Sequence, residues 1–144
     1  MFDSSDMSKA MAEFTLHPRL QSDTALVADW PLSRVLLMND ARYPWLILVP
    51  RRAEAVELFD LDLVDRVQLI DEIARASQTL KRITFAAKIN VGALGNLVPQ
   101  LHVHIVARNP GDPAWPGPVW GHSPAQPYDK AARAALIATF VNAR

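Results

Sequence analysis

Hydrophobic residues gather in short runs in the first third of the chain, and turn-forming residues separate these runs. Residues 24–28 and 33–39 each predict a strand, and 17–20 predicts a turn that enters the first of them. Residues 45–50 form a continuous apolar run, which is typical of a central strand covered on both faces. Turn chemistry at 39–44 joins two of these strands, so we expect an antiparallel hairpin.

A helical pattern follows. Asp62 can cap the start of a helix, and Asp65 is favourably placed in its first turn. The helix is predicted to end near Lys81 or Arg82. Its pattern is carried by positions that recur at helical spacing, namely Leu63, Val67, Ile70, Ala74 and Ser77.

The last part of the chain returns to strands and then to a second helix. Residues 88–92 and 98–107 predict two strands, and residues 109–127 are rich in Pro, Gly and Trp and predict an irregular loop. Residues 128–143 predict a C-terminal helix. Strands, helix, strands and helix in this order indicate an α+β fold.

Length and composition limit what the chain can be. Its 144 residues, half of them hydrophobic, predict a single domain over 1–144 with an N-terminal arm at 1–14. Fifteen basic residues balance fifteen acidic ones, which argues against a nucleic-acid partner. The chain has no cysteine, and it shows neither a signal peptide nor an apolar run long enough for a membrane helix. We therefore expect a cytoplasmic protein with no membrane partner.

The candidate chemistry lies in the strand predicted at 98–107. The chain has four histidines, and two of them, His102 and His104, are separated by one residue. Because alternate side chains of a strand point to the same face, Gln100, His102 and His104 are predicted to form one polar row. Leu101 and Val103 then point to the other face. Such a row can bind a metal or meet a phosphate.

Residues 96–108 resemble the signature of the histidine triad (HIT) superfamily, in which three histidines alternate with apolar residues. This chain departs from the signature at its first position, where Gln100 stands in place of histidine. The resemblance extends over about residues 20–110, including the hairpin that follows Asn39 and the loop that follows Asn90. The chain is most similar in type to bacterial HIT-domain proteins related to dinucleoside polyphosphate hydrolases.

The resemblance implies a fold and an activity. The implied fold is an α+β domain with an antiparallel sheet of about five strands, one long central helix and a C-terminal helix, assembled as a homodimer. The implied activity is nucleotide hydrolysis or nucleotidyl transfer at the α-phosphorus of a nucleoside polyphosphate or phosphoramidate. His102 would form the nucleotidyl-histidine intermediate. The expected ligand is a purine nucleotide or a dinucleoside polyphosphate, with no cofactor and no metal.

The resemblance also suggests roles around His102. His104 would bind the phosphate or give a proton to the leaving group, and Gln100 would donate its amide to a phosphate oxygen. Asn39 and Asn90 are candidates for contacts to the ribose and near the phosphate. The loop residues Gly95, Asn96 and Leu97 would form part of an anion-binding nest, and apolar residues of the first strands would line the base pocket. Those candidates are Val27, Leu37 and Met38.

Two other functions remain open. The glutamine at the first triad position fits a nucleotide-binding or signalling module with little catalysis. A His-x-His strand pair also supplies two metal ligands, and His17, His122 or a distant carboxylate would supply the third. The carboxylates of Asp71 and Glu72 are expected to face solvent. Residues elsewhere have simpler interpretations: Arg108 as a solvated side chain, His122 as an exposed one, and Trp115 and Trp120 as a latch for the long loop. The alternatives are that Arg108 reaches a polyphosphate tail, and that the two tryptophans close the phosphate site, with His122 near the phosphate, or are buried in the dimer.

Overall fold

The computed structural model describes residues 14–143, and its core is a five-stranded antiparallel sheet with the strand order β1-β2-β3-β5-β4. The arm predicted at 1–14 lies outside the described residues except for its last position. The hairpins β1-β2 and β2-β3 follow chain order, and β5 then pairs between β3 and β4. The strands are β1 (Thr24–Asp29), β2 (Ser33–Met38), β3 (Trp45–Pro50), β4 (Lys88–Gly92) and β5 (Val103–Arg108).

Within the described residues, four helical segments accompany the sheet: α2 (Pro18–Asp23), the 3-10 turn η1 (Leu58–Asp60), α3 (Leu63–Thr84) and α4 (Lys130–Asn142). The α3 helix begins as predicted, because the Asp62 side chain accepts the Asp65 amide, and it ends at Phe85, which has a left-handed φ of 56°. The turn predicted at 17–20 is wrong, since Pro18 instead opens a short helix. No helix in the described part of the chain is long and apolar enough to cross a membrane.

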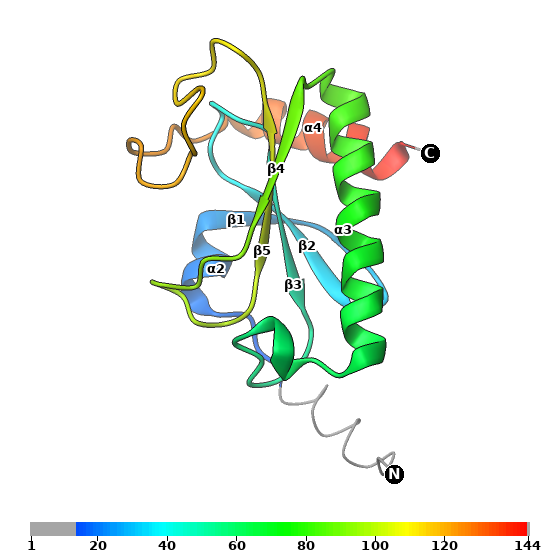
Figure 1. Ribbon diagram of the computed structural model, residues 1–144. Coiled ribbons are helices and arrows are strands. Elements are labelled where there is room, and N and C mark those ends of the chain that lie inside the picture. The colour runs from blue at the N-terminus through cyan, green and yellow to red at the C-terminus, as the bar shows by residue number, and fades with distance from the viewer. Residues whose placement is uncertain (1–13, 144) are drawn as a thin grey trace.

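The two faces of the sheet have different coverings (Figure 1). On one face, Leu46, Leu48 and Ile105 pack against α3 and α4 in the largest hydrophobic cluster. On the other face, side chains from the alternate positions, including Trp45 and Ile47, pack against α2 and the loop that precedes α4. Burial on both faces explains why β3 is apolar at every position, as the sequence predicted.

The α3 helix buries a different face from the one that its apolar pattern suggested. Leu63, Val67 and Ile70 are each more than 60% exposed. The residues that contact the sheet side are Leu69, Glu72, Ala76 and Leu80. The expectation that Glu72 faces solvent is therefore wrong: its carboxylate accepts the main-chain amides of Leu32 and Ser33, at 3.0 and 2.8 Å. These bonds connect α3 to the β1-β2 turn.

The strand predicted at 98–107 is shorter than expected, because β5 begins at Val103. Pro99 has no amide hydrogen to donate, and the paired partner β3 ends at Pro50. Before Val103, the Leu101 amide donates instead to the Ala55 carbonyl, at 2.9 Å, which is outside the sheet. His104 therefore lies on a regular strand, whereas Gln100 and His102 lie on the segment that leads into it.

Residues 109–127 form an irregular loop, as predicted, and Arg108 holds it in place. The expectation of a solvated Arg108 is wrong, because this side chain is 1% exposed. Its guanidinium donates to both carboxylate oxygens of Asp112, to the Asn90 amide oxygen and to the Gly117 carbonyl. A bidentate pair with a carboxylate gives this anchor a defined geometry. The helix that follows begins at Lys130 rather than at 128, with Asp129 as its N-cap.

Candidate active site

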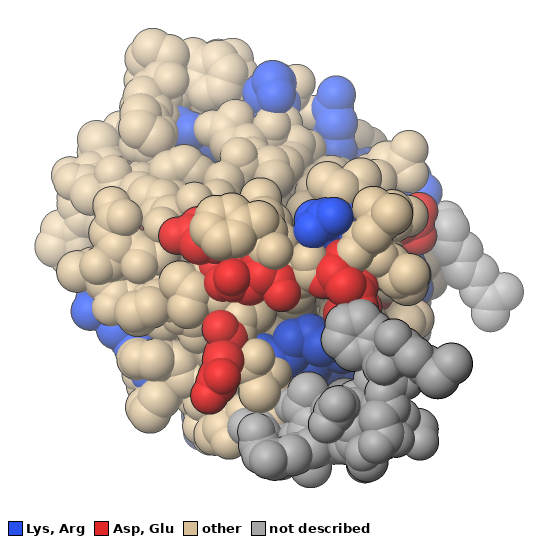
Figure 2. All heavy atoms as spheres, turned by 60° about the horizontal axis from the view of Figure 1, so that its bottom comes forward, with Lys and Arg blue, Asp and Glu red and all other residues tan. Residues whose placement is uncertain are grey.

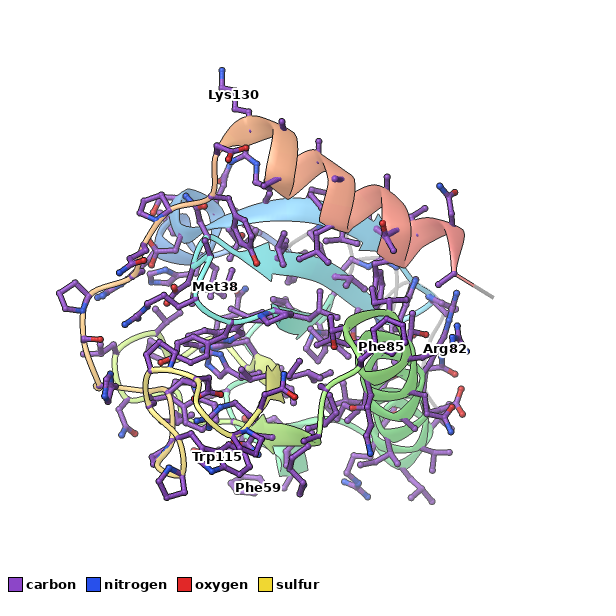
Figure 3. The ribbon with its side chains drawn as sticks, turned by 90° about the horizontal axis from the view of Figure 1, so that it is seen from above. Met38, Phe59, Arg82, Phe85, Trp115 and Lys130 are labelled. Carbon is purple, nitrogen blue, oxygen red and sulfur yellow. The ribbon has the colours of Figure 1, made fainter. Side chains whose placement is uncertain are left out.

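A pocket of about 490 Å³ opens on the face of the sheet away from α3. Its walls are mainly apolar and come from β3, α2 and the loop that precedes α4, and both histidines of β5 and its lead-in segment line it. Met38 also lines the pocket. Figure 3 shows Met38 on one side of the sheet and Phe85, at the end of α3, on the other side. The pocket is large enough for a small organic ligand of nucleotide size.

His102 is held in one tautomer by its own main chain. Its Nδ1 lies 2.7 Å from the Gln100 carbonyl oxygen. A carbonyl oxygen accepts hydrogen bonds and cannot donate them, so Nδ1 carries the hydrogen. The lone pair is then on Nε2, which has no hydrogen-bond partner within residues 14–143. His102 is 6% exposed and lines the pocket. The ring that carries this free lone pair is therefore held in a fixed orientation by its surroundings.

His104 is held in the opposite tautomer. The indole Nε1–H of Trp45 donates to Nδ1 of His104 at 3.0 Å, which leaves the hydrogen of the neutral ring on Nε2. Burial, with a smaller contribution from the charge of His102, lowers the pKa of His104 to about 3. His104 is therefore neutral near pH 7. The centres of the two imidazole rings are 4.8 Å apart, so both can reach one bound group.

The Gln100 side chain does not join this pair. Its Nε2 donates to the Thr15 carbonyl and its Oε1 accepts the His17 amide, both at 2.8 Å. Gln100 is absent from the lining of the main pocket. The predicted polar row is therefore reduced to two rings, because β5 begins only at Val103 and Gln100 lies outside the strand geometry that would align the three side chains.

The two asparagines predicted as ligand contacts lie behind the pocket wall. The side-chain oxygen of Asn39 accepts the Tyr128 amide at 2.9 Å, and that of Asn90 accepts from Arg108 at the same distance. Neither asparagine lines the main pocket.

The predicted base-lining residues divide between the two faces of the sheet. Val27 and Leu37 pack against the α3 and α4 side, so their prediction as pocket residues is wrong. Met38 lies on the pocket side. Neighbouring strand residues point to opposite faces, and the sequence did not show which face would carry the pocket.

The loop before β5 contributes backbone to the pocket. Gly95, Asn96 and Leu97 all line it, and Gly95 has a φ of +75°, which glycine adopts without strain. The main-chain amides of these three residues donate to no acceptor within residues 14–143. Free amides beside two imidazoles form a suitable environment for an anion.

Trp120 lines the main pocket and packs edge-on against His104, with ring centres 5.4 Å apart, so it forms part of the pocket wall as well as holding the loop. The sequence reasoning missed other lining residues, among them Asp40, Arg42 and Ser123. At the far end, Arg42 donates to the Asp40 carboxylate and to Ser123. Burial opposes ionisation of Asp40, but hydrogen bonds from Arg42 and Gln126 outweigh it and lower the pKa of Asp40. The contacts of Arg42 with Ser123 and of Asp40 with Gln126 join segments more than 80 residues apart, so no local sequence pattern predicts them.

A second hollow of about 260 Å³ lies beside η1 and shares His102 with the main pocket. Acidic side chains gather at this end of the molecule (Figure 2). Glu54, Glu57 and Asp60 are exposed there, and Glu57 lines the hollow. Negative potential disfavours a polyanion, so a phosphate chain is better placed in the main pocket.

No group of three or more histidine, cysteine, aspartate or glutamate side chains within residues 14–143 is arranged to hold a metal ion. His17 is instead the N-cap of α2, and His122 is exposed, as expected. The third ligand that a His-x-His metal site needs is therefore missing from the neighbourhood of His102 and His104 in this part of the chain.

Comparison with known proteins agrees with this geometry. The HIT domain family model matches residues 19–111, and the chain belongs to this family. A histidine triad protein from Bradyrhizobium japonicum is 52% identical, with 90% of this chain and 97% of that chain covered and a TM-score of 0.89. One from Sinorhizobium meliloti is 46% identical, with 93% and 99% covered and a TM-score of 0.91. A search of curated proteins found no match.

Proposed function

We propose that this protein is a nucleotide hydrolase or nucleotidyl transferase that acts at the α-phosphorus of a purine nucleoside polyphosphate or phosphoramidate, with His102 as the nucleophile. The observation that carries this proposal is the bond between His102 Nδ1 and the Gln100 carbonyl. It fixes the tautomer that leaves Nε2 free to attack. A neutral imidazole is an effective nucleophile near pH 7, and covalent catalysis divides one difficult displacement into two easier ones.

The reaction has two displacements. In the first, the lone pair of His102 Nε2 forms a bond to phosphorus, and the bond between phosphorus and the leaving group breaks with its electrons going to the leaving group. In the second, water or another acceptor forms the new bond to phosphorus and loses a proton, and the phosphorus–nitrogen bond returns its electrons to His102. A nucleoside phosphate is released or transferred, and the enzyme is restored.

His104 serves best as a hydrogen-bond donor to the phosphoryl group. Its Nδ1 is occupied by the Trp45 indole, so the available hydrogen is on Nε2. Its low pKa keeps the unliganded ring neutral, which favours phosphate binding over supply of a proton to the leaving group. The free amides of Gly95, Asn96 and Leu97 complete the proposed phosphate site. Asn39 and Asn90 support the pocket wall from behind, by accepting hydrogen bonds from the Tyr128 amide and the Arg108 guanidinium.

We also propose that the protein is a homodimer. The apolar stripe of α3 formed by Leu63, Val67 and Ile70 is exposed, although it has the spacing of a buried helix face. The edge strand β4 also exposes Val91. Unpaired strand edges and apolar stripes are the surfaces that a second copy of the chain can cover.

The test compares the wild type with His102→Ala and with His122→Ala, a matched change of an exposed histidine. Each is incubated with dinucleoside polyphosphates and with aminoacyl and lysyl adenylate analogues, and AMP binding is measured by calorimetry. We expect His102→Ala to lose turnover by at least about 10³-fold while AMP binding stays within about threefold. Equal turnover in His102→Ala would refute the nucleophile. AMP binding without turnover in the wild type would favour a binding module, and loss of activity to a chelator would favour a metal enzyme.

A further inference from the structure

Gln100 makes two hydrogen bonds that together resemble the pairing of a neighbouring strand. Its amide nitrogen donates to the Thr15 carbonyl and its amide oxygen accepts the His17 amide, each at 2.8 Å. These two main-chain groups flank Leu16. In extended chain, the carbonyl of one residue and the amide two residues later point to the same side. The carboxamide of Gln100 presents its acceptor and donor side by side, and so matches the Thr15 carbonyl and the His17 amide.

The segment that Gln100 holds leads directly into a wall of the pocket. The His17 side chain caps α2 by accepting the Arg19 amide at 3.1 Å, and its carbonyl accepts the Gln21 amide at 3.0 Å. From this short helix Leu20, which is 5% exposed, lines the main pocket. Leu20 packs in the same apolar cluster as Trp45. A six-residue helix has little stability of its own, so its position depends on such tertiary contacts.

Gln100 therefore acts on both sides of the site. Its carbonyl orients His102, and its side chain secures the segment that carries Leu20. We propose that Gln100 is a positioning residue that fixes α2 as a wall of the ligand pocket, and that its carboxamide sets ligand affinity and does not contact the reacting phosphoryl group. The identity of the ligand as a nucleotide rests on the proposed function above; the anchoring of α2 does not.

An imidazole would not reproduce this arrangement. The two nitrogens of a histidine ring direct their donor and acceptor away from each other, whereas the carboxamide directs both toward one edge. Leucine has a similar size and lacks both groups. Glutamate keeps an acceptor for the His17 amide and loses the donor for the Thr15 carbonyl. Histidine, leucine and glutamate at position 100 therefore distinguish anchoring of the segment before α2 from contact with the phosphoryl group.

The experiment compares Gln100→Leu, Gln100→Glu and Gln100→His with the wild type and with Gln78→Leu, a matched change at an exposed position of α3. Hydrogen exchange of the Gln21 amide reports on α2, AMP and GMP binding reports on the pocket, and kcat and KM are measured with the substrate found in the panel above. The exchange measurement needs no turnover, so it separates a failure of the anchoring from a failure of the proposed chemistry.

We expect Gln100→Leu to speed exchange at Gln21 and to raise Kd and KM about tenfold, a loss of about 1.4 kcal/mol, with kcat within about threefold. Gln100→His should behave like Gln100→Leu, Gln100→Glu should be intermediate, and Gln78→Leu should match the wild type. Unchanged exchange at Gln21 in Gln100→Leu would overturn the anchoring. A fall in kcat at constant KM would place the carboxamide at the phosphoryl group and overturn the assigned role.

Discussion

The indole of Trp45 donates a hydrogen bond to Nδ1 of His104 at 3.0 Å, across the pairing of β3 with β5. This bond is the counterpart of the one that His102 Nδ1 gives to the Gln100 carbonyl. The two neighbouring rings are thereby held in opposite tautomers, one with a free lone pair on Nε2 and the other with a hydrogen there. A nucleophile and a phosphate-binding donor require this difference.

Replacement of Trp45 by phenylalanine removes this donor while retaining an aromatic ring. We expect Trp45→Phe to lower kcat about five- to tenfold, because His104 would then populate both tautomers and present its hydrogen less often. Nitrogen-15 NMR of the imidazole rings should show mixed tautomers at His104.

The matched control is Trp120→Phe. Trp120 also packs against His104, but its indole nitrogen is buried and has no hydrogen-bond partner among residues 14–143. This change should leave the tautomer of His104 as it is. An equal loss of kcat in both variants would show that aromatic packing, and not the hydrogen bond, matters to His104.

The low pKa of His104 predicts a dependence of stability on pH. The folded protein binds the His104 proton only near pH 3, whereas the unfolded chain binds it near pH 6.5. Because the unfolded state binds more protons between these values, stability falls as the pH falls from 6.5 toward 3. Between pH 7 and pH 5 this group should remove about 2 kcal/mol from the free energy of unfolding.

Urea unfolding of wild type and His104→Gln at both pH values, at one protein concentration, measures this contribution. The wild type should lose about 2 kcal/mol more than the variant on going to pH 5, since the other three histidines are common to both. Equal losses would mean that the ring of His104 is protonated in the folded protein.

Glu72 is predicted to stabilise the fold through the β1-β2 turn. Its carboxylate accepts the Leu32 and Ser33 amides and the Gln68 side chain. Glu72→Gln would place an NH₂ group against one of these donors and leave a buried amide unpaired, which costs about 1–3 kcal/mol. Denaturant unfolding measures the loss. Asp71→Asn, a similar change at the exposed neighbouring position, should cost less than about 0.5 kcal/mol.

The apolar stripe of α3 predicts a change of assembly. Ile70→Glu places a charge in the proposed dimer interface and should shift the protein to monomer in light scattering after gel filtration, because a buried unpaired charge is costly. Gln78→Glu adds a charge at another exposed position of the same helix and should leave the mass unchanged. A wild type that elutes as a monomer at high concentration would exclude this interface.

Local signals predicted much of the sheet. The strands at 45–50 and 88–92 and the cap of α3 at Asp62 are confirmed, because continuous apolar runs and a capping side chain act within a few residues. The helix α2 escaped prediction because it has six residues, one of them buried, and so carries no periodicity. The buried face of α3 was misjudged because it carries Glu72, whose partners are main-chain amides that a hydrophobic pattern does not reveal.

The candidate site was also predicted only in part from the sequence. His102 and His104 are separated by one residue, so strand geometry alone suggested that they act together. The bond between Trp45 and His104 joins residues 59 positions apart, and the one between Gln100 and Thr15 joins residues 85 positions apart. Such partners are set by the register of the sheet and the path of the chain, which a single sequence does not specify. The role of Gln100 could therefore emerge only from the fold.

The most direct measurement of the central claim is a rapid-quench reaction with a substrate labelled at its α-phosphorus, followed by peptide mapping. We predict a label on the peptide that contains His102, formed within the first turnover, released by acid and stable to alkali, and lost in His102→Ala but retained in His122→Ala. Release of labelled product with no label on the protein at any time, or a label on another residue, would contradict the account.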